Sequence, residues 1–225
     1  AIAKMDASPS LAMVICSLRQ KDPQNDDLPL ITHHGKMSGK EFISRHIREN
    51  TLQHISSYAI MRSSFMKKLG GPQSMNLRDS GLEDGSGIDQ DMLFRMATLG
   101  DVDFEAEPPI RRHIGDGYTQ QLPLTFAYTQ YLYARRLVQE LGASGRMSKE
   151  SGKIYLSFRL MLIVWGALAV LKSYPSVKEK DLSRIEAHTK TPLWLYILLE
   201  WLRFGMWPDH KTRKMYFEAF APWML

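Results

Sequence analysis

Two segments of this chain are apolar around almost their whole circumference when they are read as helices. One spans residues 154–171 and is interrupted by Ser157 and Arg159; the other spans residues 193–204. A helix that is hydrophobic on all sides must be surrounded by other elements or by lipid. Because an arginine inside a membrane span costs about 2.5–3.5 kcal/mol on insertion scales, we expect two buried central helices and no membrane span.

Helix start and stop signals recur along the rest of the chain. Ser38 with Glu41, and Ser176 with Glu179, form capping boxes, while glycines and prolines follow the apolar segments. The predicted helices are residues 9–19, 39–69, 89–99, 123–142, 153–173, 176–186, 193–204 and 208–221. Strand-like alternation is scarce, so the sequence predicts an all-α fold of about eight helices.

The charged residues are unevenly distributed along the chain. Residues 79–107 contain nine Asp or Glu and only Arg95, which gives this segment a charge of −8. Since the whole chain carries +5, the remaining residues carry +13. We interpret this as a basic body with an acidic loop. A positive surplus of this size is typical of a protein that faces a polyanion.

The same segment suggests where the chain divides. We predict an N-terminal helical lobe over residues 1–107, including the acidic loop 79–107, and a C-terminal lobe over residues 108–225 that ends in an apolar tail. A basic cleft is expected between the two lobes. An apolar tail must be buried in its own core or in a neighbouring copy, so the tail or the polar arm at residues 21–39 could link copies into a homo-oligomer.

Several basic clusters have aromatic neighbours, which is the combination that single-stranded nucleic acids require: cations for phosphates and rings for bases. The alternative is that these clusters are the solvated faces of helices. The residues predicted to bind nucleic acid are Arg111, Arg112, Arg135, Arg136, Arg146, Lys149, Lys153 and Tyr131.

No catalytic motif is present, so we do not expect an enzyme. The seven histidines make no zinc-binding pattern, and the chain has one cysteine, Cys16, which suits a reducing compartment. No cofactor or metal is predicted. The nearest alternative is a Mg²⁺ or Ca²⁺ site at Asp101, Asp103, Glu105 and Glu107, but one extended segment does not make its carboxylates converge.

The leading hypothesis is a self-assembling single-stranded RNA-binding protein that encapsidates nucleic acid through a basic groove. Its general plan is similar to that of viral nucleoproteins and helical coat proteins, which implies a ribonucleoprotein or virion role. The expected location is cytoplasmic or nuclear, or in a virion, and not secreted. The alternative is a non-enzymatic helical adaptor or regulatory scaffold that uses the acidic segment 79–107 to bind a partner.

Overall fold

The computed structural model describes residues 1–21, 28–29, 35–49, 59–72, 75, 77, 82, 88–113, 124–173 and 175–221. Side chains are described for these residues except 17–21, 28–29, 48–49, 106–113, 169–173 and 175–179. The described residues are predominantly helical, with nine helices and one small sheet. The prediction of a mostly helical protein is therefore confirmed, and the prediction that strands are absent is wrong.

Contacts along the chain define two compact units. The first comprises Ala1–Gln73, Ile88–Gln120 and Ala143–Met147. The second comprises Ser74–Gly87, Gln121–Gly142 and Ser148–Leu225. The predicted lobe boundary after residue 107 and the predicted basic cleft between lobes stay predictions.

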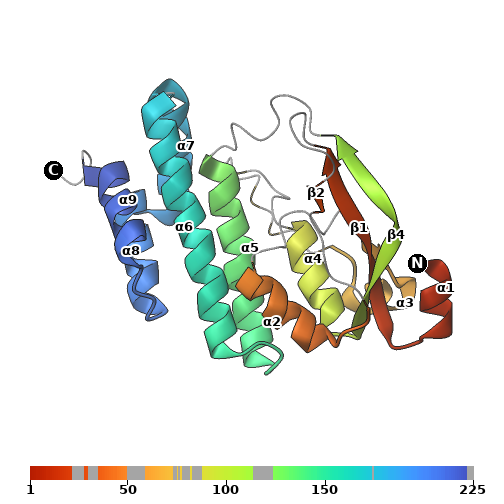
Figure 1. Cartoon of the computed structure of the whole chain (residues 1–225). Helices are drawn as coiled ribbons and strands as arrows, with labels where there is room; N and C mark the ends of the chain where they lie inside the picture. The colour runs from red at the N-terminus through yellow and green to blue at the C-terminus, as the bar shows by residue number, and fades with distance from the viewer. Residues whose placement is uncertain are drawn as a thin grey trace. The chain divides into compact units, whose positions relative to one another are not determined.

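The sheet of the first unit is built around β1 (Leu11–Lys21). This strand pairs in parallel with β4 (Asp101–His113) and antiparallel with β3 (Ala59–Met61) and β2 (Leu28–Pro29) (Figure 1). The helix predicted over residues 9–19 is wrong, because its apolar run lies in β1. The first five residues of β1 are fully buried, and a strand covered on both faces loses the alternation that identifies strands in sequence.

The long helix predicted over residues 39–69 is also wrong, because β3 interrupts it. The structure has α2 (Gly39–Glu49) before β3 and α3 (Ser63–Leu69) after it. The predicted start is confirmed, since the Glu41 amide donates to Ser38 Oγ at 3.2 Å. The three residues of β3 thus leave the predicted helix to pair with β1, and this pairing has no signal in the local sequence.

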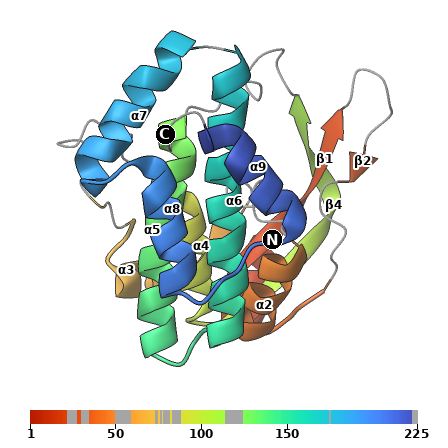
Figure 2. The ribbon, with the colours of Figure 1, turned by 90° about the vertical axis from the view of Figure 1, so that its left-hand side faces the viewer.

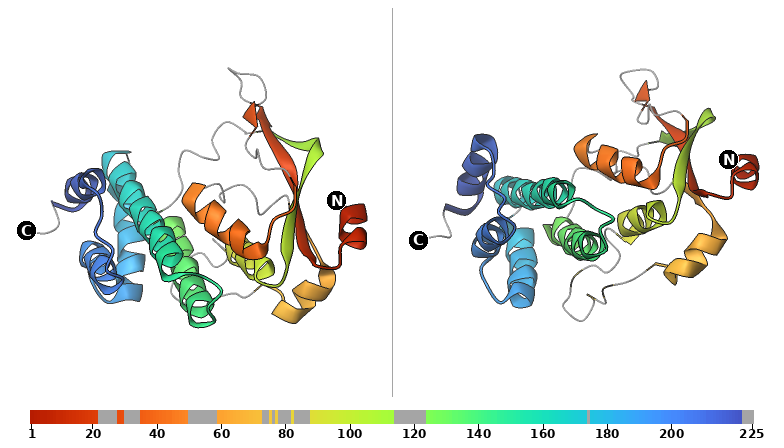
Figure 3. Two further views of the ribbon diagram at one scale, coloured as in Figure 1. Left: turned by 60° about the horizontal axis from the view of Figure 1, so that its bottom comes forward. Right: turned by 90° about the horizontal axis from the view of Figure 1, so that it is seen from below.

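Helices cover both sides of this sheet. α2 and α4 (Ile88–Ala97) lie on one side, and α1 (Ile2–Ala7) lies on the other (Figures 1 and 3). The start of α2 approaches the end of α4 so closely that a Cβ at Gly39 would lie 1.6 Å from the carbonyl oxygen of Ala97. Glycine is therefore required at this contact between the two helices.

Helices are the only regular elements among the described residues of the second unit. It contains α5 (Leu124–Ala143), α6 (Lys149–Ser173), α7 (Pro175–Thr189), α8 (Leu193–Arg203) and α9 (His210–Phe220). α6 packs against α7 and α9, and α7 packs against α8 (Figure 2). These helices lie close to the predicted ranges. However, α6 begins at Lys149, four residues earlier than predicted, and α7 begins at Pro175, so Ser176 lies inside the helix and does not cap it. The predicted apolar tail continues past α9 into residues 222–225, which lie outside the described residues.

The long apolar helix α6 is partly buried, and its arginine lies in the interior. Among the described residues it is the one helix whose length and composition would suit a membrane span, over Lys149–Leu168, and 44% of that window is buried. Arg159 in its middle is 2% exposed and donates to Gln130 Oε1 at 2.6 Å. Its guanidinium carbon also lies 5.2 Å from the centroid of the Tyr155 ring. A hydrogen-bonded, ring-stacked arginine is compatible with a protein interior.

Candidate nucleic-acid interface

Two of the predicted contact residues lie inside the second unit. Tyr131 has no exposed surface, and its hydroxyl donates to Glu200 Oε2. Arg135 is half-buried, with Nε 3.5 Å from Glu200 Oε2 and Nη1 donating to the Tyr196 hydroxyl at 3.3 Å. A ring without exposed surface cannot stack on a base, so the structure makes Tyr131 a core residue and Arg135 the counter-ion of a buried carboxylate.

The tyrosines around Glu200 confirm that this cluster is an interior network. Burial raises the pKa of Tyr131 and of Tyr128, and it raises the pKa of Tyr196 to about 12. Tyr128 contacts Tyr196 edge to face and shares a 2.9 Å hydrogen bond with His188 Nδ1. The network fixes α5 against α7 and α8.

The other predicted cations are more accessible. Arg136 is half-buried, with its guanidinium carbon 5.0 Å from the centroid of the Tyr133 ring. Arg146 is exposed and donates to Thr98 Oγ1 at 3.3 Å, while Lys149 is exposed in the first turn of α6.

Arg111 and Arg112 lie near the end of β4, and their side chains are outside the described residues. Their strand begins with the acidic run that we considered as a metal site. Within the described residues, no three His, Cys, Asp or Glu side chains group closely enough to hold a metal ion. The acidic run forms the start of strand β4, where alternate residues point to opposite faces of the sheet.

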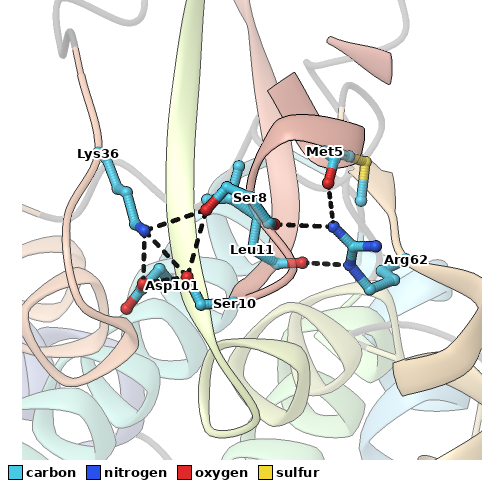
Figure 4. Close-up of polar contacts among 7 residues, drawn as sticks. All are labelled: Met5, Ser8, Ser10, Leu11, Lys36, Arg62 and Asp101. Carbon is cyan, nitrogen blue, oxygen red and sulfur yellow. Dashed lines mark hydrogen bonds and ion pairs between the residues drawn. The ribbon is translucent and has the colours of Figure 1, made fainter. Parts of the chain in front are cut away.

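The carboxylates at the start of β4 are neutralised by lysines of their own unit. Lys36 Nζ lies 2.9 Å from Asp101 Oδ2, and Lys4 Nζ lies 3.5 Å from Asp103 Oδ2 (Figure 4 shows the first pair). The hydrogen bond from Lys36, with a second from Ser10, lowers the pKa of the Asp101 carboxyl. This pairing reduces the negative charge that the acidic segment offers to a basic partner.

A groove in the second unit combines the groups that single-stranded nucleic acid requires. It has a volume of about 430 Å³ and lies between one face of α6 and the segment that joins α8 to α9. Its lining residues are Lys153, Ile154, Ser157, Phe158, Met161, Gly205, Met206, Trp207, Pro208, Asp209 and Thr212. Lys153 is the one predicted contact residue that lines it.

The turn after α8 presents Trp207 to solvent. Gly205 has φ +58°, a left-handed conformation that favours glycine, and its amide donates to the carbonyl of Leu202 at 3.1 Å. Asp209 then caps α9 by accepting the Thr212 amide at 2.7 Å, and this hydrogen bonding lowers the pKa of Asp209. Between these two fixed ends the Trp207 side chain is 65% exposed.

One cation contacts this tryptophan, and a second lines the same groove. The guanidinium carbon of Arg213 lies 5.9 Å from the centroid of the Trp207 ring, which is within cation–π range. Lys153 reaches the groove from α6, with Nζ 3.4 Å from the carbonyl oxygen of Gly205. Phe158 supplies a second ring in the lining. A base could stack on these rings while its phosphates meet the two cations.

The sequence analysis identified Lys153 but missed Trp207 and Phe158. The signal for Trp207 was its place in a Gly-Met-Trp-Pro segment between two predicted helices, where a large apolar side chain has no helical face to join. Phe158 carried no such signal, because its position in an apolar helix is equally typical of a core residue.

Comparison with protein-family models, with curated proteins and with solved structures found no match for this chain. Its function is therefore inferred from the chemistry of its residues.

Proposed function

We propose that this chain is a non-enzymatic, single-stranded RNA-binding protein of nucleoprotein or helical coat type. The groove between α6 and the α8–α9 connection receives the strand. The observation that carries this proposal is Trp207, a 65% exposed tryptophan that lies beside Arg213 and lines the groove together with Lys153. Exposing so much of an indole ring costs solvation free energy, and stacking of a base on it offsets that cost.

The charges of the chain support the same reading. The residues outside the acidic segment carry +13, and the described carboxylates Asp101 and Asp103 are paired with Lys36 and Lys4. These two pairs neutralise two of the surplus positive charges and leave most of the surplus available to a polyanion. Lysines and arginines that meet phosphates release condensed counterions, so binding should weaken steeply as salt is raised.

Self-assembly is supported by apolar surface on the second unit. Leu199 and Leu202 of α8 are 48% and 59% exposed, and Phe217 of α9 is 56% exposed. Coat-type proteins need such surface to contact neighbouring copies along the strand. Burial of these residues on assembly would make the homo-oligomer that this function requires.

The test is fluorescence anisotropy of labelled single-stranded RNA at several salt concentrations. Trp207→Ala should lower affinity roughly 5- to 150-fold, which corresponds to the ~1–3 kcal/mol that stacking contributes per base. The matched control is Trp165→Ala, because Trp165 is a half-exposed tryptophan on α6 that does not line the groove. Its substitution should leave affinity within about twofold.

A second pair of variants tests the cation. Lys153→Gln should weaken binding and reduce the salt dependence, whereas Lys180→Gln, at an exposed position of α7, should change neither. Absence of RNA binding by the unaltered protein at low salt would refute the proposal. Equal losses for Trp207→Ala and Trp165→Ala would show that the strand does not use this groove.

A further inference from the structure

The groove proposed for RNA contains a carboxylate. Asp209 lines it together with Trp207 and Phe158, and it is the only acidic residue among the described residues of the lining. Its side chain is exposed. Because a carboxylate repels phosphates at close range, a groove that contacted only the backbone of a strand would gain nothing from this charge. An acidic side chain in a groove for a polyanion therefore needs a partner other than phosphate.

The capping role of Asp209 uses only part of its hydrogen-bonding capacity. Asp209 is the N-cap of α9 and accepts the Thr212 amide on Oδ1 at 2.7 Å. Hydrogen bonds from the Thr212 side chain and amide lower the pKa of Asp209, so the group is an ionised acceptor at neutral pH. An ionised carboxylate has about four lone-pair sites, and the bonds from Thr212 do not use all of them. Capping alone does not require a carboxylate, since asparagine and serine cap equally well.

Acceptor sites close to a stacking ring suit the donors on the edge of a base. A base of a single strand is bound by stacking on an aromatic ring and by hydrogen bonds to its Watson–Crick edge. Of the four RNA bases, guanine alone has two adjacent donors on that edge, N1–H and the N2 amino group. A carboxylate accepts from two adjacent donors at once, as it does from arginine. Adenine, cytosine and uracil each have one donor group on this edge.

We propose that Asp209 makes this groove selective for guanine: a guanine base stacks on Trp207 and donates N1–H and N2–H to the Asp209 carboxylate. The inference rests on the proposed function and adds a base preference to it. Lys153 and Arg213 remain the contacts for phosphate, and Asp209 is the contact for the base edge. Stacking alone tolerates any base, and contacts to base edges specify sequence, so the carboxylate is the source of the preference.

Fluorescence anisotropy with labelled uridine oligonucleotides that contain one central guanosine measures this preference. Replacement of the guanosine by adenosine or cytidine should lower affinity roughly 5- to 150-fold, the range for a bidentate contact to a base edge. Inosine keeps N1–H but lacks the N2 amino group, so its oligonucleotide should bind with intermediate affinity. Equal affinities for these oligonucleotides would overturn the inference.

Asp209→Asn separates base recognition from capping. The asparagine oxygen still accepts the Thr212 amide, whereas its NH₂ group donates and cannot accept from guanine. We expect the guanosine preference to fall to within about twofold, because stacking on Trp207 is then the remaining contact to the base. The melting temperature should change little. If this variant does not fold, Asp209→Ser keeps a cap without a carboxylate and should lose the preference in the same way.

The matched control is Glu218→Gln, which removes the same charge from an exposed position of α9 outside the groove. It should keep the guanosine preference. Removal of a negative charge strengthens binding to every oligonucleotide alike, so the ratio of affinities is the readout. A guanosine preference that survives in Asp209→Asn or Asp209→Ser, or that is lost equally in Glu218→Gln, would overturn the inference.

The inference and the proposed function fail in different ways. If the unaltered protein binds no RNA, the proposed function fails and this inference with it. If the protein binds RNA and Trp207→Ala weakens binding, but guanosine is not preferred, only the inference is overturned. Free guanosine monophosphate has the same base edge without the neighbouring phosphates, so it should compete with the guanosine oligonucleotide only weakly. Tighter binding of the free nucleotide than of the oligonucleotide would assign the groove to a nucleotide ligand and would also overturn the inference.

Discussion

Lys36 Nζ lies 2.9 Å from Asp101 Oδ2, and the same ammonium group donates to Ser10 Oγ at 2.9 Å. Ser10 in turn donates to Asp101 Oδ2, also at 2.9 Å (Figure 4). The three side chains join the turn before β1, the segment before α2 and the first residue of β4. An acidic residue that the sequence offered as a metal ligand thus serves to connect three segments of one unit.

We expect Asp101→Asn to lower the free energy of unfolding by no more than about 1 kcal/mol, because the pair is partly exposed. The hydrogen bond from Lys36 lowers the folded-state pKa of Asp101 below 3.8. Its stabilising effect is therefore complete above pH 3.8 and is lost as pH falls through the lowered folded-state pKa. Urea unfolding at pH 7 and pH 3 measures both effects.

Added Mg²⁺ should not change the melting temperature of the protein. A magnesium-dependent rise that Asp101→Asn removes would restore the metal-site alternative.

The helices of the second unit were predictable because their signals are local. Caps, glycine stops and apolar periodicity all lie within the segment they define, as with α6 and α8. The sheet was not predictable in this way. β1 pairs with a strand that begins ninety residues later, at Asp101, and the three residues of β3 are strand only because β1 is beside them. Pairing between segments so far apart in the sequence produces no signal in the local sequence of either strand.

The predictions for the candidate site show the same difference between local signals and long-range packing. Lys153 could be proposed from charge alone, and it lines the groove. Arg135 and Tyr131 were proposed by the same reasoning, and the structure places them beside Glu200, a carboxylate 69 residues from Tyr131. Sequence patterns reveal which residues are charged or aromatic. Whether such a residue faces solvent or a buried partner depends on packing between distant helices.

Glu200 should be the most sensitive polar position of the second unit. It is 4% exposed and accepts from Tyr131 while lying 3.5 Å from Arg135 Nε. Glu200→Ala leaves the buried Tyr131 hydroxyl without its acceptor and removes the carboxylate that lies beside Arg135, so we expect a loss of about 1–3 kcal/mol in the free energy of unfolding. Glu200→Gln keeps an acceptor and should cost less. Denaturant unfolding measures both, and equal losses would contradict a stabilising role for the hydrogen-bond acceptor that Glu200→Gln retains.

His188 should make stability depend on pH. Burial lowers its folded-state pKa below 6.5, and its Nδ1 shares a 2.9 Å hydrogen bond with the Tyr128 hydroxyl. The unfolded chain therefore binds a proton at higher pH than the folded protein does. We expect the contribution of His188 to stability to be complete above pH 6.5 and to decline as pH falls toward the lowered folded-state pKa.

Urea unfolding between pH 5 and pH 8 measures this dependence. His188→Gln should flatten the profile below pH 6.5, because the neutral side chain cannot take up the proton. The control is His210→Gln, at an exposed position that begins α9, and it should keep the profile of the unaltered protein. A profile that is the same in His188→Gln and in the unaltered protein would assign the pH dependence to other groups.

Gly205→Ala should affect stability and RNA binding together. Gly205 has φ +58°, where an L-residue costs about 1–2 kcal/mol, and a Cβ there would lie 3.3 Å from Lys153 Nζ. The new methyl group therefore strains the turn that presents Trp207 and presses on the groove's lysine. We expect thermal denaturation to show a lower melting temperature and anisotropy titrations to show weaker binding.

Gly142→Ala is the matched control, since a Cβ at this helical position of α5 meets no atom within 4 Å. It should stabilise the protein by about 0.5–1 kcal/mol and leave RNA affinity unchanged. If a folded but destabilised Gly205→Ala variant binds RNA with unchanged affinity, the turn does not contribute to RNA binding.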